Sequence, residues 1–317
     1  MAPHQATLPQ LDGTLMLTDG GLETTLIFHE GAELPEFAAF DLLKDDEGTA
    51  VLCRYFDRYA EIAERRGLGL VLESPTWRAN PNWARAIGYE LDELDELNRK
   101  AIGLMHEVRD TYTSRLETIV VSGCVGPEGD GYSPASTLSA DEAGDYHARQ
   151  IAVFAEAGAD MVTAITMTYA EEAIGITRAA RKVGIPVAIS FTVETDGTLP
   201  SGQALAAAIE QVDGETDGGP DYYMINCAHP THFVEILEPG AAWVDRIRGL
   251  RANASAKSHA ELDDSVELDE GNPRELGSEH AALAHLLPSV TVLGGCCGTD
   301  HRHVDEIAAA WTAASRS

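Results

Sequence analysis

The chain is poor in positive charge. Among 317 residues, 22 are Lys or Arg and 52 are Asp or Glu, so the formal net charge is −30 at pH 7. The four lysines are Lys44, Lys100, Lys182 and Lys257. This balance argues against a nucleic-acid partner, because binding to phosphate backbones needs a basic surface. The excess of carboxylates indicates either a highly soluble protein or one adapted to a salt-rich cytosol, where carboxylates are screened and hydrated.

The sequence also lacks an apolar run of about 18 residues, the length that a membrane-spanning helix needs. Its first residues, MAPHQATLPQLDG, have neither a basic start nor an apolar stretch, which argues against a secretory signal. We therefore expect a cytoplasmic protein with small-molecule partners and no membrane partner. Assembly into a homo-oligomer is left as an open alternative. The five cysteines are an odd number, which argues against a disulfide framework.

Short apolar runs alternate with longer amphipathic stretches along the chain. The expected strands are 15–18, 70–73, 118–123, 161–166, 186–191, 222–227, 249–252 and 290–294. The clearest helical patterns between them are 52–66, 91–109, 140–157, 170–183 and 202–212. Such alternation predicts right-handed crossovers and a parallel sheet. Eight units predict a single α/β domain over residues 1–317, a (β/α)8 TIM barrel. A doubly wound open sheet is the alternative.

Polar residues and cysteines stand where the predicted strands end. The carboxyl ends of parallel barrel strands meet on one face, and that face carries the active site. The strand ends include, in chain order, Asp19 and Gly20, Glu73, Thr166, Asn226 and Cys227, and Cys296 and Cys297. The cysteines belong to the sixth and eighth strands, which lie close together around the ring. The sequence therefore predicts three thiols on one side of the barrel mouth.

Three convergent thiols in an intracellular protein predict a zinc site. Zinc accepts thiolates at about 2.3 Å in tetrahedral geometry, and three protein ligands leave the fourth position open. Gly294, Gly295 and Gly298 flank the adjacent Cys296 and Cys297, which lets the backbone curl until both sulfurs face one ion. An open site of this kind holds a substrate thiol as the nucleophilic thiolate, which suits attack on an activated methyl group.

Other polar features have a plainer interpretation. Cys53 and Cys124 lie among apolar residues and are expected to be small core residues. His229 is expected in a surface role or beside the site. The acidic segment 261–277 follows the seventh strand. It is either a solvated loop or a lid over the barrel mouth.

Three segments resemble the signatures of the homocysteine S-methyltransferase family. They are Thr18-Asp19-Gly20-Gly21-Leu22-Glu23-Thr24, Asn226-Cys227 and Gly294-Gly295-Cys296-Cys297-Gly298-Thr299. Weaker matches lie between them, so the resemblance covers about 15–307. It implies that Cys227, Cys296 and Cys297 bind Zn²⁺. It further implies that Asp19 contacts the ammonium group of the acceptor, and that a methyl group passes to the thiol of homocysteine to form methionine.

Three positions depart from the family pattern. The family has Glu-Thr at the end of the fourth strand, where the Glu also binds the acceptor ammonium, and this chain has Ile165-Thr166. Met224 replaces a Gly before Ile-Asn-Cys, and Asp300-His301 replaces Thr-Pro after Cys-Cys-Gly-Thr. Because a buried ammonium needs carboxylate partners, we expect Glu73 to take over from the missing Glu.

These considerations give a set of expected site residues. Asp19 and Glu73 are the expected catalytic and substrate-binding carboxylates, and Gly20, Thr166 and Asn226 are further expected substrate contacts.

The methyl donor is expected to be a small free molecule, because the barrel accounts for the chain and leaves no cobalamin- or folate-binding domain. S-methylmethionine or a similar sulfonium is favoured, since Trp77, Trp83 and Tyr132 could offer aromatic faces to a cation. Two alternatives stay open. One is a zinc-thiolate methyltransferase with another thiol or selenol acceptor. The other is a zinc- or redox-sensing barrel without catalysis.

Overall fold

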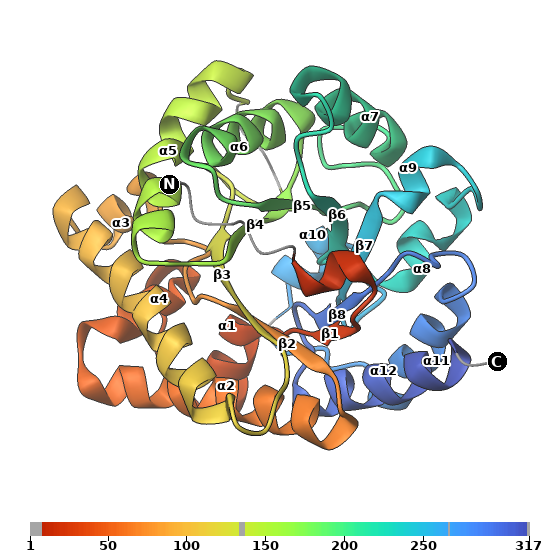
Figure 1. The fold of residues 1–317 in the computed structure, drawn as a ribbon, viewed down its shortest axis with the longest axis horizontal. Helices are drawn as coiled ribbons and strands as arrows, with labels where there is room; N and C mark the ends of the chain where they lie inside the picture. The colour runs from red at the N-terminus through yellow and green to blue at the C-terminus, as the bar shows by residue number, and fades with distance from the viewer. Residues whose placement is uncertain (1–7, 133–136, 266, 316–317) are drawn as a thin grey trace.

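Eight parallel strands close into a barrel in the computed structural model, which describes residues 8–132, 137–265 and 267–315 (Figure 1). Each strand pairs with the next in sequence, and the eighth pairs with the first. The strands are β1 (Met16–Leu17), β2 (Gly69–Glu73), β3 (Ile119–Val125), β4 (Met161–Met167), β5 (Val187–Phe191), β6 (Tyr222–Asn226), β7 (Ile247–Ala252) and β8 (Val292–Gly295). The prediction of a (β/α)8 TIM barrel is confirmed, and the open sheet is excluded.

The longer helices form a ring outside the barrel (Figure 1). The α-helices are α1 (Leu22–Thr24), α2 (Asp46–Arg66), α3 (Pro81–Ala86), α4 (Leu91–Tyr112), α5 (Ala140–Glu156), α6 (Ala170–Val183), α7 (Leu205–Thr216), α8 (Pro230–Phe233), α9 (Ala242–Asp245), α10 (His259–Asp263), α11 (Pro273–Leu283) and α12 (His301–Ala314). Shorter helical turns are η1 (Pro9–Asp12), η2 (Thr25–His29), η3 (Pro35–Phe37), η4 (Ala39–Lys44) and η5 (Val234–Ile236). Because all eight strands are parallel, their carboxyl ends lie on one face of the barrel.

Local capping chemistry sets where the helices begin and end. Helix α2 begins before the predicted position, because the Asp45 side chain accepts a hydrogen bond from the Gly48 backbone N–H at 2.8 Å. It ends at Gly67, whose φ of 64° is in the left-handed region that favours glycine. Ser139 and Glu142 form a reciprocal capping box at the start of α5. These caps fix the lengths of the helices that flank the strands.

The amino-terminal end of the barrel is filled by a small apolar core. Leu8, Met16, Tyr222 and Met224 belong to this cluster inside the barrel. The turn η1 lies across this end (Figure 1), and Gln10 within it donates a hydrogen bond to the Tyr222 hydroxyl at 3.3 Å. Among the described residues, this end of the barrel is therefore closed by packing.

Met224, one of the departures from the family pattern, is matched by a glycine on the neighbouring strand. Met224 on β6 is opposite Gly249 on β7. A Cβ atom at position 249 would lie 2.5 Å from Cγ of Met224. The larger side chain on one strand is thus accommodated by the missing side chain on the next.

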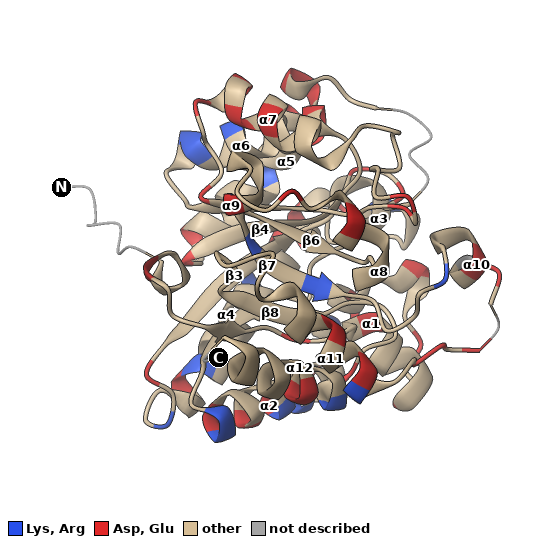
Figure 2. Cartoon of the chain, turned by 90° about the vertical axis from the view of Figure 1, so that its right-hand side faces the viewer, with Lys and Arg blue, Asp and Glu red and all other residues tan. Residues whose placement is uncertain are grey.

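Carboxylates are spread over the outer surface of the helices, and basic side chains are fewer (Figure 2). The basic side chains form ion pairs with these carboxylates. Arg149, for example, bridges Asp92 at 2.7 Å and Asp95 at 2.9 Å. Such exposed pairs contribute little to stability individually. No described helix combines the length and the apolar character that crossing a bilayer requires.

Candidate active site

A cavity of about 330 Å³ lies at the carboxyl ends of the strands. Its lining includes all but one of the predicted site residues, namely Asp19, Gly20, Glu73, Thr166, Cys227, Cys296 and Cys297. The rule that places active sites at this face of a barrel therefore brings these residues together.

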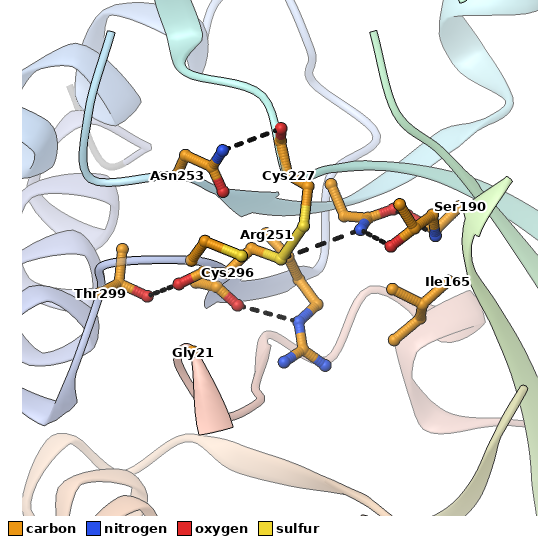
Figure 3. The surroundings of a disulfide bond; sticks show 12 residues. Gly21, Ile165, Ser190, Cys227, Arg251, Asn253, Cys296 and Thr299 are labelled. Carbon is orange, nitrogen blue, oxygen red and sulfur yellow. Dashed lines mark hydrogen bonds between the residues drawn. A yellow bond between two sulfur atoms is a disulfide. The ribbon is translucent and has the colours of Figure 1, made fainter. Parts of the chain in front are cut away.

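The three predicted metal-binding cysteines converge in this cavity. Cys227 directly follows β6, and Cys296 and Cys297 directly follow β8. Their Sγ atoms lie within 4.8 Å of one another. Cys227 and Cys296 form a disulfide (Figure 3). The odd cysteine count argued against a disulfide framework, and this single bond was not expected. The physical reason is that convergence for one metal ion also brings two sulfurs within bonding reach.

Two hydrogen-bond donors face the sulfur atoms. The Tyr132 hydroxyl donates to Sγ of Cys227 at 3.3 Å and lies 3.5 Å from Sγ of Cys297. Nδ2 of Asn226 lies 3.9 Å from Sγ of Cys296. Donors of this kind favour the charged thiolate over the thiol in the reduced site.

Asn226 connects three strands behind the cysteines. Its Oδ1 accepts from the Thr166 backbone N–H at 2.9 Å and from the Ser190 hydroxyl at 2.6 Å. Its Nδ2 donates to the Thr166 hydroxyl at 2.9 Å. Thr166 and Cys227 have φ angles of 66° and 51°, which are strained for residues other than glycine. The Asn226 amide bonds hold Thr166 in this conformation, whereas the Cys227 carbonyl accepts a hydrogen bond from Nδ2 of Asn253 at 2.9 Å. The predicted contact of Asn226 with substrate stays a prediction.

A buried ion pair joins Asp19 to Arg251, a residue that the sequence analysis missed. Nη2 of Arg251 donates to Oδ1 of Asp19 at 2.8 Å, and each side chain is 7% exposed. Thr18 donates to the same oxygen at 2.9 Å, and the Tyr55 hydroxyl donates to Oδ2 at 3.0 Å. Burial alone would lower the pKa of Arg251, but the Asp19 and Glu73 carboxylates raise it above its usual value. Arg251 therefore stays charged in the cavity.

Glu73 ends β2 and lines the same cavity. It is 5% exposed, and its Oε2 has no hydrogen-bond partner among the described residues. Burial raises the pKa of Glu73 to about 7, although Arg251 and the Thr163 and Ser122 hydroxyls act to lower it. Glu73 therefore lies in the cavity with one oxygen free to accept a hydrogen bond, which its predicted role requires.

Glu23 is a second carboxylate that lines the cavity. Its pKa is raised to about 7, chiefly by burial and also by the Asp19 charge. It stands in the segment that first suggested the family, but the sequence analysis gave it no role.

Ile165 occupies the position where the family has Glu. It is 6% exposed and lines the cavity. The indole N–H of Trp77 lies 3.4 Å from the Ile165 carbonyl oxygen. This part of the cavity is therefore an apolar surface.

His259, at the start of α10, is a further residue that the sequence analysis missed. Its Nε2 lies 2.6 Å from the Cys227 carbonyl oxygen, and its Nδ1 lies 3.1 Å from Glu194. Its ring lies 4.3 Å from the Tyr132 ring. The Ser258 N-cap beside it was the available signal, because it marks a helix start. His259 thus connects the cysteine-bearing turn to the acidic segment.

The acidic segment 261–277 covers part of the cavity. Leu262, Glu267, Leu268 and Asp269 lie in the lining. Asp269 accepts from the Ser255 hydroxyl at 2.9 Å, which ties the segment to the turn after β7. Of the two interpretations from the sequence, the lid agrees with this placement.

Aromatic side chains surround the cavity opening. Phe28 and Phe37 are 46% and 45% exposed and line the cavity together with Trp77 and Tyr132. Trp83 was expected there as well, but its ring packs against the Arg78 guanidinium at 3.6 Å.

A family model described as homocysteine S-methyltransferase matches residues 16–311. The chain belongs to the homocysteine S-methyltransferase family. Homocysteine S-methyltransferase 1 of Arabidopsis thaliana is 25% identical over 326 aligned residues, which cover 93% of each chain. Methionine synthase of Mycobacterium leprae is 27% identical over 280 residues, covering 81% of this chain and 20% of that longer one. The predicted resemblance and the predicted enzyme class, a methyltransferase, are confirmed.

Solved structures show the same fold. The metallated form of the homocysteine methyltransferase MmuM from Escherichia coli has a TM-score of 0.69 at 17% identity, covering 95% of this chain and 98% of that one. Its oxidized form has a TM-score of 0.68 at 18% identity, covering 93% of this chain and 95% of that one. These likenesses concern the fold.

Proposed function

We propose that this chain transfers a methyl group from a small sulfonium donor to the thiol of homocysteine, with one zinc ion held by Cys227, Cys296 and Cys297. The observation that carries the proposal is the convergence of the three Sγ atoms within 4.8 Å of one another in the cavity at the barrel mouth.

The donor set suits zinc. Three sulfur ligands, with no fourth ligating side chain grouped with them in the described part of the chain, match an open catalytic site. Cys227 and Cys296 can serve as ligands only after their disulfide is reduced, because zinc binds thiolates. The MmuM enzyme has been solved in oxidized, metallated and apo forms. By analogy, the disulfide described here represents an oxidized state of the site.

Bound zinc would lower the pKa of the acceptor thiol and present its sulfur as a thiolate. The protein's own residues then orient the two substrates. Asn253 donates to the Cys227 carbonyl and so holds the Cys227 turn, and the Tyr132 hydroxyl donates to Sγ of Cys227. Glu73 offers its free oxygen to the acceptor ammonium, and the acidic segment restricts access of water. Methyl transfer needs this alignment more than it needs proton transfer.

Aromatic side chains at the cavity opening support a cationic donor. Phe28, Phe37 and Trp77 present apolar rings, and the Glu23 carboxylate lines the same cavity. A sulfonium is attracted by ring faces and by a nearby carboxylate. We therefore expect S-methylmethionine or a related sulfonium to serve, and methylfolate not to serve.

The test is a donor screen with the reduced, zinc-supplied protein and homocysteine, in which methionine is identified by mass spectrometry. S-methylmethionine, S-adenosylmethionine, betaine and methylfolate are supplied separately. Methionine formed from a sulfonium supports the proposal. Rapid turnover with methylfolate alone would overturn the donor assignment, and no methionine from any donor would overturn the function.

A redox-sensing barrel is favoured by one observation, the Cys227–Cys296 disulfide. A sensor without catalysis does not need a cavity lined by buried Asp19, Glu73 and Arg251. The same screen separates the two, because a sensor produces no methionine.

A further inference from the structure

Four buried polar atoms in the cavity lining have no partner among the described residues, and two of them belong to the charged side chains at the strand ends. These two are Nη1 of Arg251, a cationic donor, and Oε2 of Glu73, a carboxylate acceptor; the other two are Nε of Arg78 and Oδ1 of Asn253. Unsatisfied buried polar groups are rare in folded proteins, and each needs an explanation. Of the Arg251 and Glu73 atoms, one can donate to an anion and the other can accept from a cation.

The rest of the Arg251 guanidinium is held in place by the protein. Nε donates to the Gly295 carbonyl at 3.1 Å. Nη2 donates to Asp19 at 2.8 Å and to the Gly20 carbonyl at 3.3 Å. Figure 3 shows the guanidinium extending past the Cys227–Cys296 pair, between Gly21 and Ile165. Its free nitrogen is therefore held in a fixed position in the lining of the cavity that also contains the cysteines.

Asp19, in contrast, has little capacity left for a ligand. Its two oxygens accept from Thr18, Arg251 and Tyr55, and its charge is balanced by Arg251. An ammonium at Asp19 would have to compete with a guanidinium already bonded to it. The second carboxylate expected for that ammonium is missing, because Ile165 stands in its place.

We propose that Arg251 binds the carboxylate of the acceptor through Nη1, that Asp19 acts as a positioning residue for Arg251, and that Glu73 accepts from the acceptor ammonium. This inference rests on the proposed function, because it assumes that the cavity takes a thiol acceptor. It assigns the acceptor class as a thiol that carries a carboxylate, and it gives Asp19 a different role from direct contact with the ammonium.

The charges in the cavity agree with this assignment. Arg251 has two carboxylates near it, and the pKa of Arg251 is raised above its usual value by both Asp19 and Glu73. An acceptor carboxylate at Nη1 and an ammonium at Glu73 would pair both free atoms at once. A zwitterionic amino-acid thiol therefore fits better than a neutral one.

The experiment uses homocysteine and two analogues, each of which lacks one of its charged groups. Homocysteine has both groups, mercaptobutyrate lacks the ammonium, and aminopropanethiol lacks the carboxylate. Binding of each to the reduced, zinc-loaded protein is measured by calorimetry without donor, and KM and kcat are measured with donor. Binding without donor keeps the acceptor question separate from methyl transfer.

Arg251→Gln is expected to weaken binding of homocysteine and mercaptobutyrate by about 10- to 100-fold, the effect of one lost charged hydrogen bond, and to leave aminopropanethiol unchanged. Glu73→Gln is the matched variant with the opposite pattern. It should weaken binding of homocysteine and aminopropanethiol and leave binding of mercaptobutyrate unchanged. Arg251→Lys should restore part of the lost affinity, because a charge returns without the planar fork.

Asp19→Asn separates the two possible roles of Asp19. If Asp19 positions Arg251, the substitution Asp19→Asn should raise KM for the two carboxylate-bearing thiols and not for aminopropanethiol. If Asp19 held the ammonium, aminopropanethiol and homocysteine would be affected instead, and the assignment would be wrong.

Arg251→Gln leaves Asp19 buried without its cation, so the double variant Asp19→Asn/Arg251→Gln removes both charges and guards against misfolding. It should show the same selective loss as Arg251→Gln. An equal loss for all three thiols in both variants would make Arg251 merely structural and overturn the inference. If homocysteine binds with the predicted pattern but no donor gives methionine, the proposed function fails and the acceptor site stands.

Discussion

The two ends of the barrel interior have opposite chemistry. At the amino-terminal end, Met16, Tyr222 and Met224 pack together, and η1 closes the opening. At the carboxyl-terminal end, Asp19, Glu73 and Arg251 are also buried but ionisable, and two of them keep an unsatisfied atom. Burying charge without full pairing costs stability. The amino-terminal end therefore stabilises the fold. The carboxyl-terminal end lowers the stability of the fold and forms the site.

The largest expected effect comes from breaking the sulfur cluster at the carboxyl-terminal end. Replacement of Cys297 or Cys227 by Ala should reduce methyl transfer by orders of magnitude and lower the zinc content from about one per chain, because two thiolates hold zinc poorly. The fold should remain, as measured by circular dichroism. Cys53→Ala is the matched control, since Cys53 packs against the outer core. Full activity in the Cys227 or Cys297 variant would refute the ligand assignment.

A change at the amino-terminal end should show the reverse pattern. Met224→Ala removes a side chain that is 1% exposed from the inner core. The resulting cavity should lower the free energy of unfolding by about 2–5 kcal/mol. Urea denaturation measures this loss, and KM for homocysteine should stay within about twofold, because the packing change is at the far end of the strands. A large rise in KM with unchanged stability would show that the two ends are not independent.

The third prediction concerns pH and the charged end. The folded pKa of Glu73 is raised from 4.5 to about 7, so the folded state favours its proton. The stability linked to this proton is fully present below about pH 4.5 and is lost as pH rises through about 7. Glu73→Gln should remove that loss and make the protein more stable at pH 8 by on the order of 2–3 kcal/mol.

Urea denaturation of wild type and Glu73→Gln at pH 5 and pH 8 measures this difference. Glu96→Gln, on the exposed surface of α4, controls for removal of one carboxylate. Since Glu23 has a similarly raised pKa, part of the wild-type slope should persist in the Glu73 variant. Parallel pH dependences for wild type and Glu73→Gln would contradict the burial argument.

The sequence was sufficient for features that depend on local patterns. Each predicted strand overlaps an observed one, and the predicted helix 170–183 matches α6. The cysteines could be located because each directly follows a strand, and strand ends meet on one face. Asn226 was also found in this way, but its bonds to Thr166 and Ser190 on neighbouring strands could not be read from the chain order.

Features that depend on long-range contacts were missed. Arg251 and Asp19 are 232 residues apart, and Arg251 stands in β7 beside Leu250 and Ala252. An arginine between two apolar residues of a barrel strand was the available signal, because a buried charge needs a partner. The pairing of Cys227 with Cys296 depends on how far the two turns close in space, which sequence spacing does not define.

The smallest expected effect concerns salt, and it applies to the surface rather than to either end of the barrel. The net charge of −30 produces repulsion among surface carboxylates. The Debye length falls from about 30 Å at 0.01 M salt to about 10 Å at 0.1 M, so most of the relief should occur at low KCl. Each kcal/mol of relieved repulsion raises Tm by about 2 °C in a protein of this size. Sucrose, which stabilises by exclusion from the surface whatever the charge, serves as the control.

The buried Asp19–Arg251 pair is screened much less than exposed charges, so the selectivity between homocysteine and aminopropanethiol should change little over the same range of KCl. A Tm that stays flat or falls as KCl rises would contradict the view that the surface is adapted to salt, and a selectivity that changes in parallel with Tm would show that the charged end is open to solvent.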